Sequence, residues 1–160
     1  MSDTGREIVV RGPASAFAQQ IEIGVHRLIA DEPTSAGGVD AGPDPYALLC
    51  ASLGACTSMT IGLVARQRQW PLDSVTVRLR HGKVHAEDCA DCEKKPRKID
   101  RIERDIELFG PLTDEQRAAL LDIADRCPVH RTLTSDIQIH TRLLNVDGAA
   151  EPGTADASAG

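Results

Sequence analysis

The sequence predicts a protein that combines antiparallel β-strands with two main helices. Three observations support this class. Short segments near both ends of the chain alternate apolar and polar residues, as strands with one buried face do. A long apolar segment runs from Pro45 toward Arg66, and a second helical pattern surrounds Leu120. With 160 residues, of which 41% are hydrophobic, the chain is suited to one domain, expected over residues 1–144.

The first strands are expected at residues 7–11, 17–23 and 25–30. Phe17, Gln19, Ile21 and Ile23 alternate with Ala18, Gln20 and Glu22, and a Gly-Pro turn precedes them. These segments predict an antiparallel meander. Residues 33–43, rich in Gly, Ser and Asp, have no period and read as a loop that leads into the long helix.

The long helix has a clear start. Asp44 can accept hydrogen bonds from the first free backbone N–H groups, and Pro45 suits the first helical position. The end is expected near Trp70, because Pro71 disfavours a helical residue before it. Helical spacing predicts a buried stripe made of Leu49, Ser52, Leu53, Cys56, Met59, Thr60 and Leu63. Cys56 in this stripe is either an apolar core residue or a chemical group; Cys50, on another face, reads as core.

Strands are expected after the long helix at residues 75–80 and 102–108, and we expect the two to form a long hairpin. Arg104 is the one interruption on the apolar side of the second strand. The hairpin would carry an extended polar arm over residues 81–98. A closing strand is expected at residues 137–141, and residues 145–160 have the composition of a disordered tail.

The second helix opens with a capping box, Thr113 with Gln116. Its apolar stripe is Leu120, Ile123, Ala124 and Cys127. Pro128 should break or kink this helix near Cys127. If a new helix begins at Pro128, Cys127 lies at its N-terminus, where a thiolate is favoured.

Composition excludes several classes of partner. The formal net charge is -6, with a sequence pI of about 5.3, which argues against nucleic acid or an anionic membrane surface. The first residues do not resemble a secretory signal, and we expect no window long enough for a membrane span. We therefore expect a cytosolic protein. Five cysteines in a reducing compartment are more often catalytic, metal-binding or buried than disulfide-bonded.

Two motifs together indicate a family. Gly42-Pro43-Asp44-Pro45 leads into Leu53-Gly54-Ala55-Cys56, and Cys127-Pro128-Val129-His130 closes the second helix. With these motifs the chain resembles the OsmC/Ohr family of thiol peroxidases, from about His26 to Thr141. The resemblance implies an α+β fold with antiparallel sheets and two central helices. It also implies an intertwined homodimer with active sites at the interface.

The resemblance implies a role for each cysteine of the pair. Cys56 would be the peroxidatic cysteine, which attacks an organic hydroperoxide and becomes a sulfenic acid. Cys127 would resolve it to a disulfide, which an external dithiol then reduces. Tyr46 and the apolar residues Leu49, Leu53 and Met59 would line the substrate site. No cofactor is required for this chemistry.

Thiolate formation at Cys56 needs a cation, because this residue lies too deep in the helix for the terminal field to act. The family uses an arginine from the N-terminal sheet, for which Arg27 is the candidate, with solvated surface as the alternative. The family's glutamate near the helix start is replaced by Tyr46, which is uncharged near neutral pH. His130 and Arg131 either compensate or face solvent. The alternative function is an OsmC-fold redox sensor or a small-molecule or metal-binding protein with little turnover.

The hairpin arm holds a second group of candidate ligands, His81, His85, Cys89 and Cys92. Their residue types and close spacing are those of a tetrahedral zinc site. Three interpretations remain open: a zinc or other soft-metal site, an auxiliary dithiol, and an exposed arm without chemistry. Neighbouring acidic residues disfavour a reactive thiolate there.

Overall fold

The computed structural model describes residues 5–85 and 98–144 of the chain. Strands β1 (Ile8–Arg11), β2 (Gln19–Ile23) and β3 (His26–Ala30) form an antiparallel sheet in the order β1-β2-β3. Val10 pairs with Ile21, and Ile21 with Leu28. The predicted meander is therefore confirmed. A short 3-10 turn, η1 (Thr34–Ala36), lies in the loop that follows.

Helix α1 (Pro45–Gln67) begins where the sequence predicts. The Asp44 carboxylate accepts a hydrogen bond from the Ala47 N–H at 2.9 Å, and Pro45 occupies the first turn. After Gln67 the chain turns through Gln69, whose φ is 53°, and leaves the helix before Trp70. The local signals at both ends thus determine the extent of α1.

The buried face of α1 differs from the predicted stripe. The buried residues are Leu53, Gly54, Thr57, Ile61 and Ala65. Of the predicted stripe, Leu53 is buried, whereas Leu49, Met59 and Leu63 are exposed by 37%, 72% and 47%. The helix is apolar on opposite sides, so helical spacing alone could not choose the face that meets the rest of the chain.

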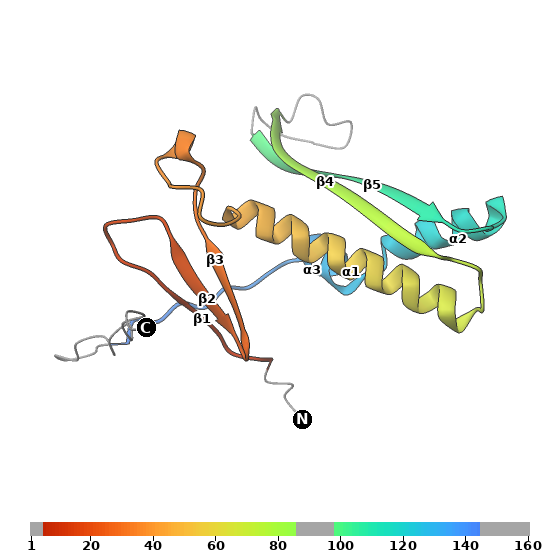
Figure 1. Cartoon of the computed structure of the whole chain (residues 1–160), viewed down its shortest axis with the longest axis horizontal. Coiled ribbons are helices and arrows are strands. Elements are labelled where there is room, and N and C mark those ends of the chain that lie inside the picture. Colours follow the sequence, from red (N-terminus) through yellow and green to blue (C-terminus); the bar gives the residue numbers. More distant parts are fainter. Residues whose placement is uncertain (1–4, 86–97, 145–160) are drawn as a thin grey trace, which may run out of the picture.

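Strands β4 (Ser74–His85) and β5 (Lys98–Phe109) form the expected hairpin, paired from Ser74 with Phe109 to His85 with Lys98. The hairpin lies along α1, and the three-stranded sheet stands beyond the start of that helix (Figure 1). β4 approaches α1 closely at Gly54, where an added Cβ would lie 2.7 Å from the Leu79 side chain. The rest of the predicted arm and the predicted C-terminal tail fall on residues 86–97 and 145–160, outside the described residues.

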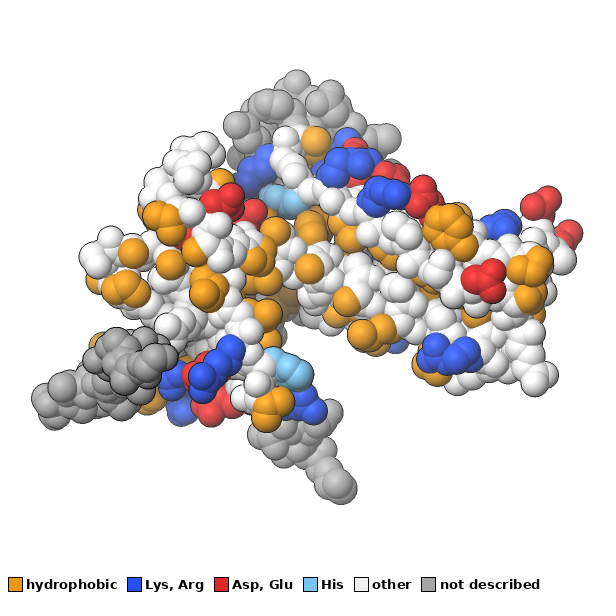
Figure 2. Space-filling model, viewed as in Figure 1, with side chains coloured by type: hydrophobic (Ala, Val, Ile, Leu, Met, Phe, Trp, Pro, Cys, Tyr) orange, Lys and Arg blue, Asp and Glu red, His pale blue; other side chains and the backbone are white. Residues whose placement is uncertain are grey.

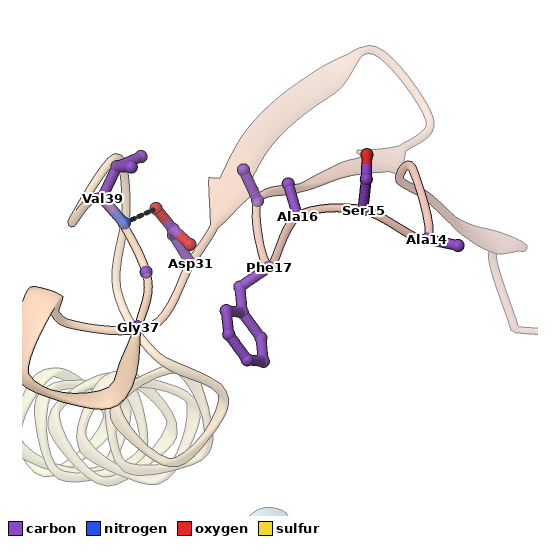
Figure 3. Close-up of a pocket in the computed structure, with 9 residues that line it drawn as sticks. Ala14, Ser15, Ala16, Phe17, Asp31, Gly37 and Val39 are labelled. Carbon is purple, nitrogen blue, oxygen red and sulfur yellow. Dashed lines mark hydrogen bonds between the residues drawn. The ribbon is translucent and has the colours of Figure 1, made fainter.

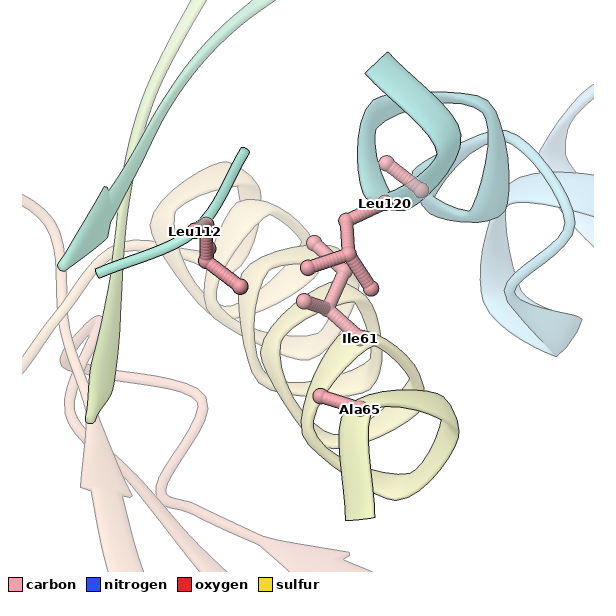
Figure 4. Close-up of a cluster of buried hydrophobic side chains, with 5 residues drawn as sticks. Ile61, Ala65, Leu112 and Leu120 are labelled. Atoms are coloured by element: carbon pink, nitrogen blue, oxygen red, sulfur yellow. The ribbon is translucent and has the colours of Figure 1, made fainter. Parts of the chain in front are cut away.

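Helices α2 (Asp114–Ala124) and α3 (Pro128–Leu133) complete the described structure. The capping box is confirmed, with the Gln116 N–H donating to Thr113 and the Gln116 side chain accepting from the Thr113 N–H. The main core lies between α1, α2 and the loop after β5 (Figure 4). Its buried members are Ile61, Ala65, Leu112, Leu120 and Ala124.

The prediction of a closing strand at residues 137–141 is wrong. Residues 136–144 carry no strand, and Ile137 and Ile139 are exposed by 55% and 84%. The alternation of apolar side chains is present, but within residues 5–85 and 98–144 nothing covers Ile137 and Ile139. Figure 2 shows that apolar side chains also gather on the three-stranded sheet and along α1.

The expectation that no segment is long enough to span a membrane is also wrong. α1 has the length and composition for a span, with a mean hydropathy of 1.8 in its most apolar window. Central helices of folded domains pass the same test, and α1 contacts β4, α2 and α3. Only 22% of that window is buried within this chain, so α1 has a large uncovered apolar surface.

Candidate functional site

Cys127 lies at the junction between α2 and α3. The sequence predicted either a kink or a break at Pro128. The structure has a break, since Pro128 begins a new helix and Cys127 is its N-cap residue. Its Sγ accepts a hydrogen bond from the His130 N–H at 3.3 Å. The side chain is fully buried. The proline thus places this thiol inside the protein with a backbone donor aimed at it.

The middle of α1 meets Cys127. Thr57, also fully buried, has its Oγ1 3.7 Å from Cys127 Sγ. The neighbouring Cys56 is partly buried, and its thiol is one of the groups that lower the pKa of Cys127. The structure therefore brings together the two cysteines that the sequence singled out, one from each helix.

Arg104 of β5 reaches the same region and contacts Thr57 of α1 and Asp125 at the end of α2. Its guanidinium donates to Thr57 Oγ1 at 2.9 Å, to the Ala124 carbonyl at 3.2 Å and to the Asp125 carboxylate at 2.6 Å. Its side chain is only 12% exposed. Sequence reasoning did not assign it a role. The available signal was its position on the apolar side of β5, where a charged residue needs buried partners.

The surroundings of Cys127 lower the pKa of its thiol. Burial is the largest influence and opposes ionisation. The His130 N–H, the Thr57 hydroxyl, the Cys56 thiol and the charge of Arg104 together outweigh burial, so the pKa lies below its ordinary value. The predicted resolving cysteine is thus a thiol whose surroundings favour the thiolate.

Cys50 on the same helix has the opposite character. Burial raises the pKa of its thiol, and the negative charge of Asp44 raises it further. Cys50, expected to be a core residue, is only partly buried and is not a member of the main core. A protonated thiol is poorly reactive, so Cys50 lies outside the candidate site.

Tyr46 stacks on His81. The ring centroids are 4.2 Å apart and the planes differ by 5°. His81 Nε2 is also 2.9 Å from the Asp100 carboxylate of the paired strand. This contact attaches the first turn of α1 to the hairpin. Tyr46, a predicted substrate-lining residue, therefore has a partner of its own.

The other predicted substrate-lining residues lie on two sides of α1. Leu53 is buried, whereas Leu49 and Met59 face outward. Arg27, on β3, has a side chain that is 84% exposed and lies 3.8 Å from Glu22. Among the described residues, no contact links Arg27 to Cys56.

The two residues that follow Pro128-Val129 also have defined surroundings. His130 Nδ1 lies 3.8 Å from the Asp125 carboxylate, and its side chain is 29% exposed. Arg131 is exposed. His130 acts on Cys127 through its backbone N–H rather than through its ring.

The predicted metal ligands are described only in part. His81 and His85 both belong to β4, four positions apart, which corresponds to about 13 Å along a strand. Cys89 and Cys92 lie outside the described residues, so the zinc site stays a prediction. Within residues 5–85 and 98–144, no group of three or more His, Cys, Asp and Glu side chains is placed to hold a metal ion.

A separate hollow of about 400 Å³ lies beside the N-terminal sheet (Figure 3). It is lined mainly by small and apolar residues, including Phe17 and Val39. Asp31 at its edge accepts from the Val39 and Ala41 N–H groups at 3.1 and 3.0 Å. These bonds hold the loop that leads toward α1 and explain why a buried carboxylate is tolerated.

Comparisons with known proteins agree with the fold. The model of a family described as OsmC-like protein matches residues 37–142. No curated protein matches the chain. Among solved structures, an organic hydroperoxide resistance protein OsmC from Legionella pneumophila superimposes with a TM-score of 0.62 at 18% identity, covering 84% of this chain and 92% of that one.

Two further structures show the same likeness. An OsmC-like protein from Mycoplasma pneumoniae has a TM-score of 0.59 at 20% identity, covering 82% of this chain and 88% of that chain. The organic hydroperoxide resistance protein OhrB of Bacillus subtilis has a TM-score of 0.57 at 18% identity, with 82% and 91% covered. At these identities the likeness concerns the α+β fold, with its antiparallel sheets and central helices. Together with the family match over most of the chain, it shows that this protein belongs to the OsmC-like family.

Proposed function

We propose that this chain is a cysteine-based peroxidase that reduces organic hydroperoxides, with Cys56 and Cys127 as the working pair. The observation that carries the proposal is the meeting of the two thiols, with surroundings that lower the pKa of Cys127. Several solved structures of the same fold are named organic hydroperoxide resistance proteins, which supports the substrate class.

The proposed cycle begins with one proton shared by two sulfurs. In this proposal the Cys127 thiolate takes the proton of the Cys56 thiol, which leaves Cys56 as the nucleophile. The Cys56 thiolate attacks the distal peroxide oxygen, the O–O bond breaks, and an alkoxide leaves. The alkoxide takes the proton from Cys127 and departs as the alcohol.

The second half of the cycle uses the thiolate restored at Cys127. It attacks the sulfenic acid of Cys56, the S–O bond breaks, and hydroxide leaves as the disulfide forms. An external dithiol then reduces this disulfide by thiol exchange, and its own two sulfurs become oxidised. Both protein groups needed for the cycle come from the chain itself, and no cofactor is required.

The direct test is oxidation of the reduced protein by cumene hydroperoxide and by hydrogen peroxide, followed by mass-spectrometric mapping of the disulfide. We expect faster oxidation by the organic peroxide and a bond between Cys56 and Cys127. Slow oxidation by both peroxides, or a bond confined to Cys89 and Cys92, would sink the proposal.

A redox sensor with slow turnover is the second candidate function. The observation that favours it concerns Tyr46, which stands where the family is expected to have a glutamate. The Tyr46 ring stacks on His81 and cannot form an ion pair with an arginine. The Tyr46→Glu variant distinguishes the two functions. A large gain in the peroxidase rate would favour the sensor, because the native site would then not be tuned for turnover. An unchanged or lower rate would favour the peroxidase.

A homodimer is also proposed. Exposed apolar side chains of α1, among them Leu49, Met59 and Leu63, would be covered by a second copy of the chain. Light scattering coupled to size-exclusion chromatography checks this, and a monomer at micromolar concentration would contradict it.

A further inference from the structure

Thr57 connects Arg104 to the thiol pair. Its hydroxyl lies 2.9 Å from the Arg104 Nη1 on one side and 3.7 Å from the Cys127 Sγ on the other. The side chain is fully buried, so water does not compete for these contacts. A threonine in this position forms a bridge between a strand and the start of α3.

The direction of the hydrogen bonds in this bridge follows from the donor and acceptor capacity of each group. A guanidinium can only donate, so Thr57 Oγ1 accepts from Arg104. The single hydroxyl proton of Thr57 is then free to point at Cys127 Sγ. Of the two donor assignments that the 3.7 Å distance allows, this makes threonine the donor and sulfur the acceptor.

Arg104 is held rigidly enough to impose that direction. It also donates to the Ala124 carbonyl and to Asp125, from the two ends of its fork. These partners fix the plane of the guanidinium, and 12% exposure of the side chain limits screening of its charge. A buried charge with this many partners is expensive to desolvate, and an apolar residue would fit the alternation of β5 better.

We propose that Arg104 and Thr57 are positioning residues that form a one-way hydrogen-bond relay from β5 to the thiol pair, and that this relay stabilises negative charge on the Cys127 sulfur. The relay makes the loss of the first proton from the pair easier. Its effect on turnover rests on the proposed peroxidase function, but its effect on the ionisation of the pair does not.

Other charged groups near the pair are few among the described residues. Asp125, at the end of α2, pairs with Arg104 and lies 3.8 Å from His130 Nδ1. Its carboxylate partly offsets the charge of Arg104. From α1 the titratable neighbour is Cys56 itself. β5 therefore acts on the sulfur in two ways, through the charge of Arg104 and through the Thr57 hydroxyl that Arg104 orients.

The test measures thiolate absorbance at 240 nm against pH in the full chain with Cys50, Cys89 and Cys92 changed to serine. Cys56 and Cys127 are then the only thiols in the chain, and the first step of thiol ionisation belongs to the pair as a whole. We expect Thr57→Val, which keeps the shape and removes the hydroxyl, to raise the midpoint of that step by about one pH unit. The separate variant Thr57→Ser, which keeps the hydroxyl, should have the same midpoint as the protein with Thr57.

Thr60→Val is the matched control, because Thr60 lies one turn further along α1 and its hydroxyl donates to the Cys56 carbonyl at 2.7 Å. It should leave the midpoint unchanged. An unshifted midpoint in Thr57→Val, or an equal shift in Thr57→Ser, would overturn the relay. Circular dichroism establishes that each variant is folded.

Arg104→Gln gives a second measurement if Thr57→Val does not fold. It should raise the midpoint in the same direction, whereas Arg80→Gln should not, because Arg80 is an exposed arginine of the same hairpin paired with Asp105. An equal shift in both arginine variants would contradict the proposal. Since no peroxide enters the titration, a shifted midpoint together with an inactive parent protein would reject the peroxidase function and retain the relay.

Discussion

The thiol pKa is shifted in opposite directions at Cys50, near the beginning of α1, and at Cys127, which packs against the middle of α1. At the beginning, burial and the Asp44 carboxylate raise the pKa of Cys50. In the middle, burial acts in the same direction on Cys127, but backbone and side-chain donors and the charge of Arg104 outweigh it. Burial by itself thus makes an unreactive thiol. What distinguishes the second region is a set of hydrogen-bond donors and a cation.

The largest expected difference between the two regions concerns turnover. Cys56→Ser should lower the rate of dithiol-dependent cumene hydroperoxide reduction by at least about 100-fold, because serine at its ordinary pKa is not a nucleophile for peroxide. Cys50→Ser should stay within about twofold of the parent protein, as expected for a thiol outside the reaction. Initial rates at pH 7 check both. Equal losses in the two variants would remove the distinction.

The next difference is a contrast in how stability depends on pH. The pKa of Cys127 is lowered on folding, so its ionisation contributes stability that is present above the unfolded value of about 8.5 and lost as pH falls through the folded value. The pKa of Cys50 is raised, so its contribution is present below about 8.5 and lost as pH rises through the folded value.

Urea unfolding of reduced protein at a series of pH values measures this contrast. The destabilisation caused by Cys127→Ser should grow from pH 6 to pH 9, and that caused by Cys50→Ser should shrink above about pH 8.5. Parallel pH profiles for the two variants would mean that the two thiols have similar surroundings.

A smaller effect is expected where the first turn of α1 meets the hairpin. The stacked rings of Tyr46 and His81 should show a coupling energy of about 0.5–1.5 kcal/mol in a double-mutant cycle to alanine. Chemical denaturation gives the four free energies of unfolding. Additive effects would show that the stack does not attach the helix to β4. Leu121→Ala, at an exposed position of α2, serves as the neutral control.

The smallest effect is expected from Asp44→Asn. Asparagine still caps α1, so the free energy of unfolding should change by no more than a few tenths of a kcal/mol, whereas Asp44→Ala should cost about 1 kcal/mol. Loss of the negative charge should lower the pKa of Cys50 and increase its rate of alkylation at pH 8. An unchanged alkylation rate would leave burial as the sole cause of the raised pKa.

Local signals predicted much of the fold because their causes lie within a few residues. Asp44 with Pro45 starts α1, Thr113 with Gln116 starts α2, and Pro128 separates α2 from α3. Each cap satisfies backbone groups of its own turn, so no distant contact is needed to recognise it. The meander and the hairpin followed from alternation in the same way.

The candidate site was predictable only in its two cysteines. Arg104 was visible as an exception in an apolar pattern, but nothing in the sequence said which helix it would meet. Thr57 was absent from the predicted stripe because α1 is apolar on opposite sides. The chosen cation, Arg27, is an exposed residue of β3 that lies beside Glu22 of the neighbouring strand.

The sequence by itself determined the order and the ends of the elements and placed a cysteine on each of two helices, because capping, proline geometry and side-chain period act over one or two turns. Tertiary structure decided which face of α1 is buried and which thiol has the lowered pKa. Those outcomes depend on how the hairpin and α3 pack against α1, because this packing brings Arg104, Thr57 and Cys127 from three separate elements to within hydrogen-bonding distance. Electrostatic effects of this kind follow distance in space, and distance along the chain does not report it.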